Sequence, residues 1–88
     1  MSREEIIARL KTILLDTDER SAAALDACGE DAELTTDLGL NSVGMLFMVI
    51  SIEESFGVVF ENVAIGDFVT VRDVVDYLET RLKETGAL

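Results

Sequence analysis

Apolar residues recur at helical spacing near the start of the chain. Between about residues 3 and 15 they stand three or four positions apart, as on one face of a helix, at Ile6, Leu10, Ile13 and Leu14. Ser2 precedes this segment and Glu5 follows Ser2 by three positions, which is the spacing of the capping box that starts many helices. We therefore expect a first helix over residues 3–15.

A second periodic segment lies near the end of the chain. Thr70 stands where a helix N-cap is expected, and Asp73 occupies the third helical position. The apolar stripe that follows has the spacing of a buried helix face, at Val71, Val74, Val75, Leu78 and Leu82. This pattern predicts the last helix over residues 71–84.

The densest apolar segment lies between these two. It begins at Ser42 and continues to about Phe56, and Gly57 is placed as a C-terminal stop. At about 100° per residue its positions form two stripes about 160° apart. One stripe is Met45, Val49, Ile52 and Phe56, and the other is Val43, Phe47, Ile50 and Glu54. The other helices can cover only one side, so one stripe is expected to face outward unless the long loop before Ser42 covers it.

The connections between the helices differ in length. Residues 16–41 form a long connection, which we expect to be functional or to carry a short helix of its own. Residues 58–60 could be read as a strand but have no second strand to pair with, so we expect an irregular segment with a short helical turn near residues 62–67. The chain shows no internal repeat and no domain boundary. The pattern predicts an all-α fold in a single domain, residues 1–88, with three main helices and a minor one packed as a small bundle.

Charge is unevenly distributed along the 88 residues, whose formal net charge is −11. No lysine or arginine lies between Arg20 and Arg72, whereas nine acidic residues do. Such a surface repels phosphate backbones and anionic lipid, so neither nucleic acid nor a membrane is an expected partner. It attracts proteins with basic surfaces. The alternative is that the acids only keep a small domain soluble.

The residues needed for several kinds of catalysis are missing. The chain has no histidine, so a serine hydrolase mechanism lacks its base and zinc lacks a ligand cluster. Residues 16–27 begin with alternating aspartates but lack the glycine and the final glutamate of a calcium loop. The one cysteine, Cys28, is expected in a loop without a catalytic role. We therefore expect no enzyme activity and no metal site. A lone reduced thiol, with no signal peptide and no apolar run of membrane length, indicates the cytoplasm.

Ser42 places a hydroxyl at the start of the apolar middle segment. Serine is a common N-cap, and capping would be its ordinary role there. The start of a helix also stabilises an anion such as a phosphodiester, and the preceding loop lets a modifying enzyme reach the hydroxyl. On spacing alone, a cap and an attachment point both remain open.

Residues 37–60, DLGLNSVGMLFMVISIEESFGVVF, resemble the phosphopantetheine attachment region of acyl carrier proteins. That family has a Leu-Gly turn before an Asp-Ser-Leu trio, and then an apolar helix that ends in acidic residues and Phe-Gly, here EESFG. Asn41 stands in place of the aspartate, and Val43 in place of the leucine. The opening helix, the acidic loop and the last helix also fit, so the resemblance covers essentially the whole chain.

The resemblance implies a four-helix bundle with a short third helix and a long loop between helices one and two. It implies that Ser42 receives 4′-phosphopantetheine from coenzyme A through a magnesium-dependent phosphopantetheinyl transferase. The thiol of this arm would carry acyl groups as thioesters for fatty-acid or polyketide-type biosynthesis. Fatty-acid carriers often have acids where Gly44 and Phe47 stand here, which keeps a specialised pathway open. The family's register also selects the stripe ending in Phe56 as the buried one.

The resemblance further implies which proteins bind this chain and which of its residues they contact. Expected partners of the monomer are the transferase and the acyl-transferring and condensing enzymes, with basic docking surfaces. The expected docking residues are Asn41, Val43, Phe47, Ile50, Glu53 and Glu54. Two alternatives stay open: a peptidyl or aryl carrier of a peptide-assembly system, and a helical interaction module whose Ser42 is never modified.

Overall fold

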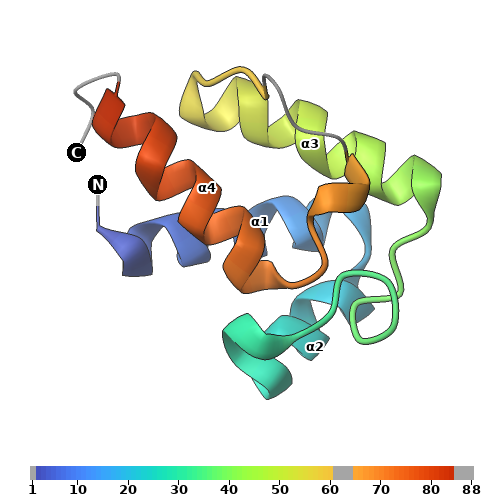
Figure 1. Ribbon diagram of the computed structural model, residues 1–88. Coiled ribbons are helices and arrows are strands. Elements are labelled where there is room, and N and C mark those ends of the chain that lie inside the picture. The colour runs from blue at the N-terminus through green and yellow to red at the C-terminus, as the bar shows by residue number, and fades with distance from the viewer. Residues whose placement is uncertain (1, 61–64, 85–88) are drawn as a thin grey trace.

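The computed structural model of the chain describes residues 2–60 and 65–84. Its four α-helices are α1 Arg3–Thr17, α2 Glu19–Cys28, α3 Ser42–Phe56 and α4 Val71–Glu84 (Figure 1). Its two short 3-10 helices are η1 Gly29–Asp31 and η2 Ile65–Asp67. The predicted all-α bundle is confirmed, and η2 is the expected short helix. Residues 62–64 of that expected turn lie outside the described residues.

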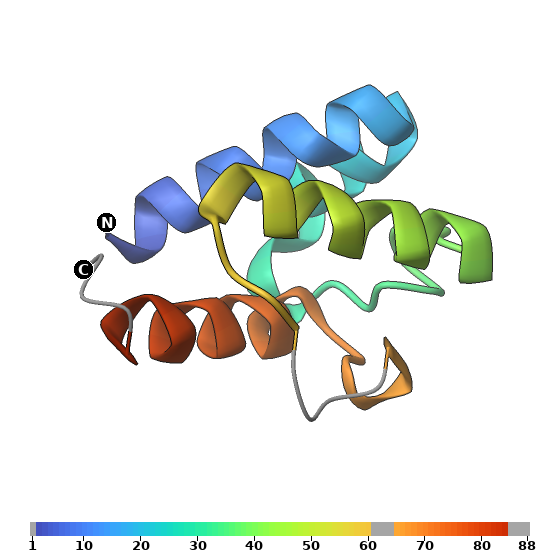
Figure 2. The ribbon, with the colours of Figure 1, turned by 90° about the horizontal axis from the view of Figure 1, so that it is seen from above.

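α1 is the central helix of the bundle, because it contacts α2, α3 and α4. α1 and α3 run side by side in opposite directions, and the start of α1 lies at the same end of the bundle as the end of α4 (Figure 2). The predicted stripes of α1 and α4 are both buried between the helices. None of the described helices is both long and apolar enough to cross a membrane.

Several helix ends lie at residues that the sequence marks, although α1 continues two residues past its expected end, to Thr17. The Glu5 N–H donates to Ser2 Oγ at 3.2 Å, at the start of α1. Thr70 and Asp73 cap α4 reciprocally: the Asp73 N–H donates to Thr70 Oγ1 at 3.3 Å, and the Thr70 N–H donates to Asp73 Oδ2 at 3.1 Å. Gly57 ends α3 with a φ of 68°, in the left-handed conformation that favours glycine.

The long connection between α1 and α3 carries α2 and η1, so it does contain a helix of its own. Asp18 caps α2, because its carboxylate accepts the Arg20 N–H at 2.9 Å. The side-chain hydrogen bond from the Arg20 guanidinium and this backbone bond together hold the pKa of Asp18 below its ordinary value. α2 buries only three side chains, Ser21, Ala22 and Leu25, and of these only Leu25 is both large and apolar.

The expectation that Cys28 lies in a loop was wrong. Cys28 is the last residue of α2, and its side chain is exposed. The reason is that the alanine-rich run before it continues as helix, since alanine has the highest helix propensity. The helix stops only at Gly29, whose φ is 67°.

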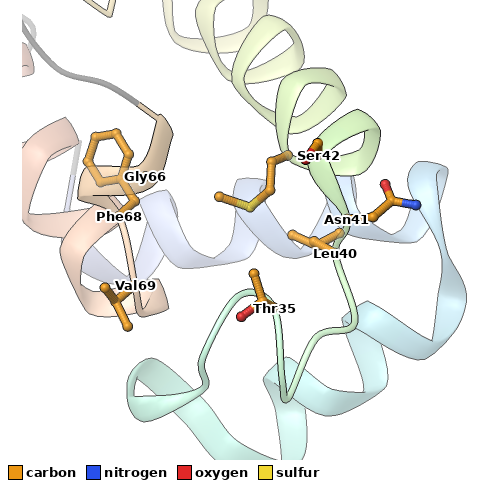
Figure 3. A pocket seen from close by; sticks show the side chains of 8 residues that line it. Thr35, Leu40, Asn41, Ser42, Gly66, Phe68 and Val69 are labelled. Atoms are coloured by element: carbon orange, nitrogen blue, oxygen red, sulfur yellow. The ribbon is translucent and has the colours of Figure 1, made fainter.

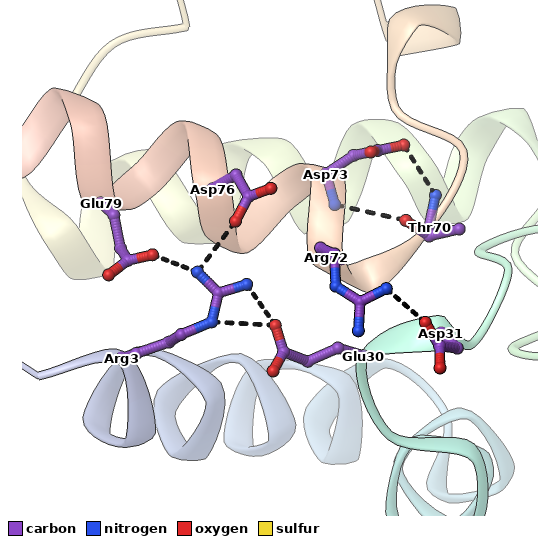
Figure 4. A network of polar contacts seen from close by, with 8 residues as sticks. All are labelled: Arg3, Glu30, Asp31, Thr70, Arg72, Asp73, Asp76 and Glu79. Atoms are coloured by element: carbon purple, nitrogen blue, oxygen red, sulfur yellow. Dashed lines mark hydrogen bonds and ion pairs between the residues drawn. The ribbon is translucent and has the colours of Figure 1, made fainter.

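Arg3 ties the start of α1 to two other parts of the bundle (Figure 4). Its guanidinium pairs with Asp76 of α4 at 2.8 Å and also with Glu79. Its Nε donates to Glu30 Oε1 of η1 at 2.9 Å. These carboxylates, Glu30 foremost, raise the pKa of Arg3. The network therefore joins α1, η1 and α4 near the outer edge of the core.

Candidate functional site

Ser42 is the first residue of α3, and its side chain is exposed. The N-cap is Asn41, whose Oδ1 accepts the Gly44 N–H at 2.8 Å. The possibility that Ser42 is the cap was therefore wrong, because the preceding residue makes the capping bond. No residue that the structure describes forms a hydrogen bond with the Ser42 hydroxyl, which leaves that hydroxyl free for another role.

The turn that leads into Ser42 is anchored by a buried hydroxyl. Ser21 of α2 is 1% exposed, and its Oγ donates to the Leu38 carbonyl oxygen at 2.6 Å. Gly39 follows with a φ of 71°, and the Leu40 N–H donates to the Leu34 carbonyl oxygen at 3.0 Å. These bonds hold the chain just before α3. Sequence reasoning missed Ser21, whose only signal was a polar residue within an otherwise apolar helix stripe.

A groove of about 700 Å³ opens beside Ser42. In Figure 3, Phe68 and Val69 lie on one side of it, Leu40, Asn41 and Ser42 on the other, and Thr35 between them. The complete lining is Thr35, Leu40, Asn41, Ser42, Met45, Gly66, Phe68 and Val69. Its side chains come from α3, from the loop before α3 and from the segment before α4, so the groove exists only in the folded chain.

The far wall of the groove is fixed by α4. The Asp73 carboxylate accepts the Val69 N–H at 2.9 Å as well as the Thr70 N–H, and these two bonds lower the pKa of Asp73. Phe68 packs against the rings of Phe60 and Tyr77, each at a centroid distance of 5.6 Å. The wall of the groove opposite Ser42 is therefore held in place by hydrogen bonds to α4 and by ring packing, and it is largely apolar.

The two apolar stripes of α3 lie as predicted. The stripe that ends in Phe56 is buried, together with Met48, which neither predicted stripe included. The outward stripe is exposed, and the described part of the preceding loop does not cover it. Leu46 lies beside this stripe and is exposed as well. The exposed fractions are 75% for Val43, 50% for Leu46, 49% for Phe47 and 47% for Ile50.

The two glutamates at the end of α3 have different surroundings. Glu54 is exposed and continues the outward stripe. Glu53 is half-buried, and its Oε2 accepts the Phe60 N–H at 2.9 Å. Glu53 therefore stabilises the turn after α3, while Glu54 is available at the surface.

The comparisons with known proteins bear on what this site holds. The phosphopantetheine attachment site family matches residues 8–78 of the chain. The chain belongs to the acyl carrier protein family. It is 34% identical to the acyl carrier protein of Coprothermobacter proteolyticus over 93% of this chain and 96% of that protein. For the acyl carrier protein of Thermotoga maritima the identity is 34% over 92% and 96%, and for that of Renibacterium salmoninarum it is 35% over 88% and 91%.

Acyl carrier proteins are carriers rather than catalysts, and 4′-phosphopantetheine is their cofactor. The residues of this carrier fit such an arm. An exposed hydroxyl stands at the start of α3, whose first turn contains no acidic residue that would repel a phosphodiester. The adjoining groove has room for an extended chain along an apolar wall. Among the described residues there is no group of three or more His, Cys, Asp or Glu side chains placed to hold a metal ion.

Proposed function

We propose that Ser42 is the attachment residue of the 4′-phosphopantetheine arm. One observation carries the proposal: the Ser42 hydroxyl is exposed at the mouth of the groove, while Asn41 performs the capping that would otherwise engage a serine. Ser51 and Ser55 lie within the body of α3, away from any helix start. Of the serines in α3, Ser42 alone lines the groove.

The carrier's own residues hold and present the hydroxyl but do not activate it. The chain has no histidine, and no described side chain accepts the Ser42 proton, so the modifying enzyme supplies the base. The oxygen of Ser42 would form a phosphodiester, stabilised by the N-terminal end of the α3 dipole. When bound, the arm supplies a thiol that carries an acyl group as a thioester.

The cargo that suits the groove is apolar. Leu40, Met45, Phe68 and Val69 provide most of its lining, and the side chains of Thr35 and Asn41 are neutral. Such walls favour an alkyl chain over a charged aminoacyl group, which would lose hydration there without gaining a partner. This supports acyl intermediates of fatty-acid or polyketide-type biosynthesis. We propose that residues 1–88 act as one monomeric carrier domain, served by a phosphopantetheinyl transferase and by condensing and acyl-transferring enzymes with basic docking surfaces.

The attachment residue is tested by intact-mass measurement after incubation with coenzyme A and a purified broad-specificity phosphopantetheinyl transferase. The unchanged carrier should gain the mass of one arm, whereas Ser42→Ala should remain folded and gain none. Ser55→Ala is the matched control, because Ser55 is an exposed serine of the same helix, and it should be modified like the unchanged carrier. Modification of Ser42→Ala would show that the arm is attached elsewhere.

The cargo is tested by loading the arm with acetyl, hexanoyl or octanoyl groups and recording the methyl NMR signal of Met45, which lines the groove. The signal should shift further as the acyl chain lengthens. Identical spectra for all three cargoes would show that the groove does not take the acyl chain.

A further inference from the structure

Ser21 has a buried hydroxyl that the proposed function does not use. Its side chain is 1% exposed, and among the residues that the structure describes it is the only buried one that is polar. The three residues that follow it in α2 are Ala22, Ala23 and Ala24, and alanine would be the better helix former at position 21 as well. The reason for a serine therefore lies in what its hydroxyl contacts outside α2.

The Ser21 hydroxyl bonds differently from the threonines within the helices. Thr12, Thr17 and Thr80 each donate to the carbonyl oxygen four residues earlier in their own helix. Ser21 Oγ instead donates to the Leu38 carbonyl oxygen at 2.6 Å, in the segment that leads into α3. A buried carbonyl without a donor is costly, so this bond fixes the direction in which the Leu38 carbonyl points.

The residue after Leu38 makes this bond decisive. It is Gly39, whose φ is 71°. Glycine adopts positive and negative φ with similar ease, so Gly39 alone does not select the orientation of the peptide unit that joins it to Leu38. Rotation of that unit would turn the Leu38 carbonyl away from Ser21 and would change the φ of Gly39. The Ser21 hydrogen bond therefore selects the positive φ, and with it the direction in which the chain enters α3.

The chain on either side of this peptide unit is held by backbone hydrogen bonds. The Leu38 N–H donates to the Glu33 carbonyl oxygen at 3.0 Å, and the Leu40 N–H donates to the Leu34 carbonyl oxygen at 3.0 Å. Leu40 is also buried, at 5% exposed. The orientation of the one peptide unit after Leu38 is left to Ser21, and Ser42 follows only two residues after Leu40.

We propose that Ser21 is a positioning residue for the loading of Ser42. By holding the Leu38 carbonyl, it keeps the start of α3 in the orientation that presents the Ser42 hydroxyl to the modifying enzyme. α2 is a fixed base for this contact, because Ala22 and Leu25 are buried in the hydrophobic core. This inference rests on the proposed role of Ser42, and it gives α2 a part in presenting that residue.

The test measures kcat/KM for arm transfer from coenzyme A to the full chain, with a purified broad-specificity phosphopantetheinyl transferase. Ser21→Ala should lower kcat/KM for the carrier about tenfold, because loss of a buried hydrogen bond commonly changes a conformational equilibrium by that factor. The matched control is Ala22→Gly, which weakens α2 at the next buried position but leaves the bond to Leu38 intact. The kcat/KM of Ala22→Gly should be unchanged.

Gly39→Ala disturbs the same peptide unit without touching α2. A Cβ at Gly39 would meet nothing within 4 Å apart from its chain neighbours, so the substitution acts through its unfavourable positive φ and not through a clash. Gly39→Ala should also lower kcat/KM. The double variant with Ser21→Ala should lose no more than the more impaired single variant, since both act on one conformation. Losses that multiply would show that Ser21 acts independently of this peptide unit and would overturn the inference.

NMR measures the turn itself. The coupling between the amide and α protons of Gly39 depends on φ, so it should change in Ser21→Ala and stay the same in Ala22→Gly. Hydrogen exchange of the Leu40 amide, whose bond closes the turn, should accelerate about tenfold in Ser21→Ala relative to that of Leu78 in α4. Unchanged coupling and exchange in Ser21→Ala would show that the hydroxyl does not set the turn, and the inference would be refuted.

The outcomes separate this inference from the proposed function. If Ser21→Ala melts at a lower temperature but keeps the normal kcat/KM, its hydroxyl serves stability alone; the inference is overturned and the attachment residue stands. If Ser42→Ala is loaded, the proposed function fails and the inference fails with it. If Ser21→Ala does not fold, Gly39→Ala takes its place, because Gly39 is exposed, and a normal kcat/KM for that variant overturns the inference.

Discussion

α3 and α4 have nearly the same length, and each buries five apolar side chains, yet their outer faces differ. The outer face of α4 has charged residues such as Arg72 and Asp76, as expected for a helix that only completes a core. The outer face of α3 instead has exposed apolar side chains, Val43, Leu46, Phe47 and Ile50. Since α4 folds with a single apolar stripe, the second stripe of α3 is more than packing requires. We infer that it serves contacts with other proteins.

The largest expected effect tests whether the buried sides of the two helices are equivalent. Met48 of α3 and Leu78 of α4 are both 0% exposed. Met48→Ala and Leu78→Ala should each lower the free energy of unfolding by about 2–5 kcal/mol, from lost apolar burial and the cavity left behind. Chemical denaturation measures both. A loss for Met48→Ala as small as that of a surface variant would show that α3 is not packed as described.

The next-largest expected effect concerns the N-cap of α3, which differs from that of α4. α3 begins with the Asn41 cap alone, so Asn41→Ala should cost about 1 kcal/mol, because the Gly44 N–H loses its partner. Asn41→Asp should retain the cap and the stability, since a carboxylate accepts the same N–H and is favoured at a helix N-terminus. Equal destabilisation by both substitutions, measured by chemical denaturation, would contradict the capping role.

The stability that the cap of α4 contributes is expected to depend on pH, unlike the stability from the cap of α3. Backbone hydrogen bonds from Val69 and Thr70 lower the pKa of Asp73 in the folded state. The stability that the ionised Asp73 contributes is therefore fully present above the unfolded-state pKa, and it is lost as the pH falls through the lower folded-state pKa. The melting temperature of Asp73→Asn should lie below that of the unchanged carrier at pH 7, and the gap should shrink below about pH 4. The gap for Asn41→Ala should not follow this trend, because its cap carries no charge. A constant gap for Asp73→Asn in thermal melts would refute the prediction.

The smallest expected effect on stability belongs to the exposed apolar side chains of α3. Phe47 is the neighbour of Met48 in sequence, yet about half of its surface is exposed. Phe47→Ala should therefore change the free energy of unfolding by no more than about 0.5 kcal/mol, as surface substitutions usually do. A loss of about 3–5 kcal/mol would mean that Phe47 is buried in solution, and the contrast between the two helices would disappear.

Local patterns were enough to predict the main helices. The stripes of α1 and α4, the caps at Ser2 and Thr70, and the stop at Gly57 are all confirmed. Each depends on residues within one or two turns of each other, so sequence spacing carries the information. α2 was harder to predict, because its buried stripe of Ser21, Ala22 and Leu25 is too short and too weakly apolar to show a clear period.

The parts of the site that were missed are those that depend on distant residues. Ser21 anchors the Leu38 carbonyl from another helix, and Phe68 reaches the groove from beyond α3. Glu53 and Glu54 are adjacent in sequence, but only the folded chain brings the Phe60 N–H to Glu53. No periodicity in the sequence distinguishes these roles.

By itself the sequence determined the three main helices and placed Ser42 at the start of one of them, because these are consequences of short-range geometry. Only the structure showed that Asn41 rather than Ser42 makes the cap and that a groove opens beside the hydroxyl. Periodicity alone left open which stripe of the doubly apolar α3 is buried, and the family resemblance selected the right one. The physical reason is that a helix with two apolar faces has no preferred side in isolation. The buried side of α3 is set by the neighbours that pack against it, foremost α1.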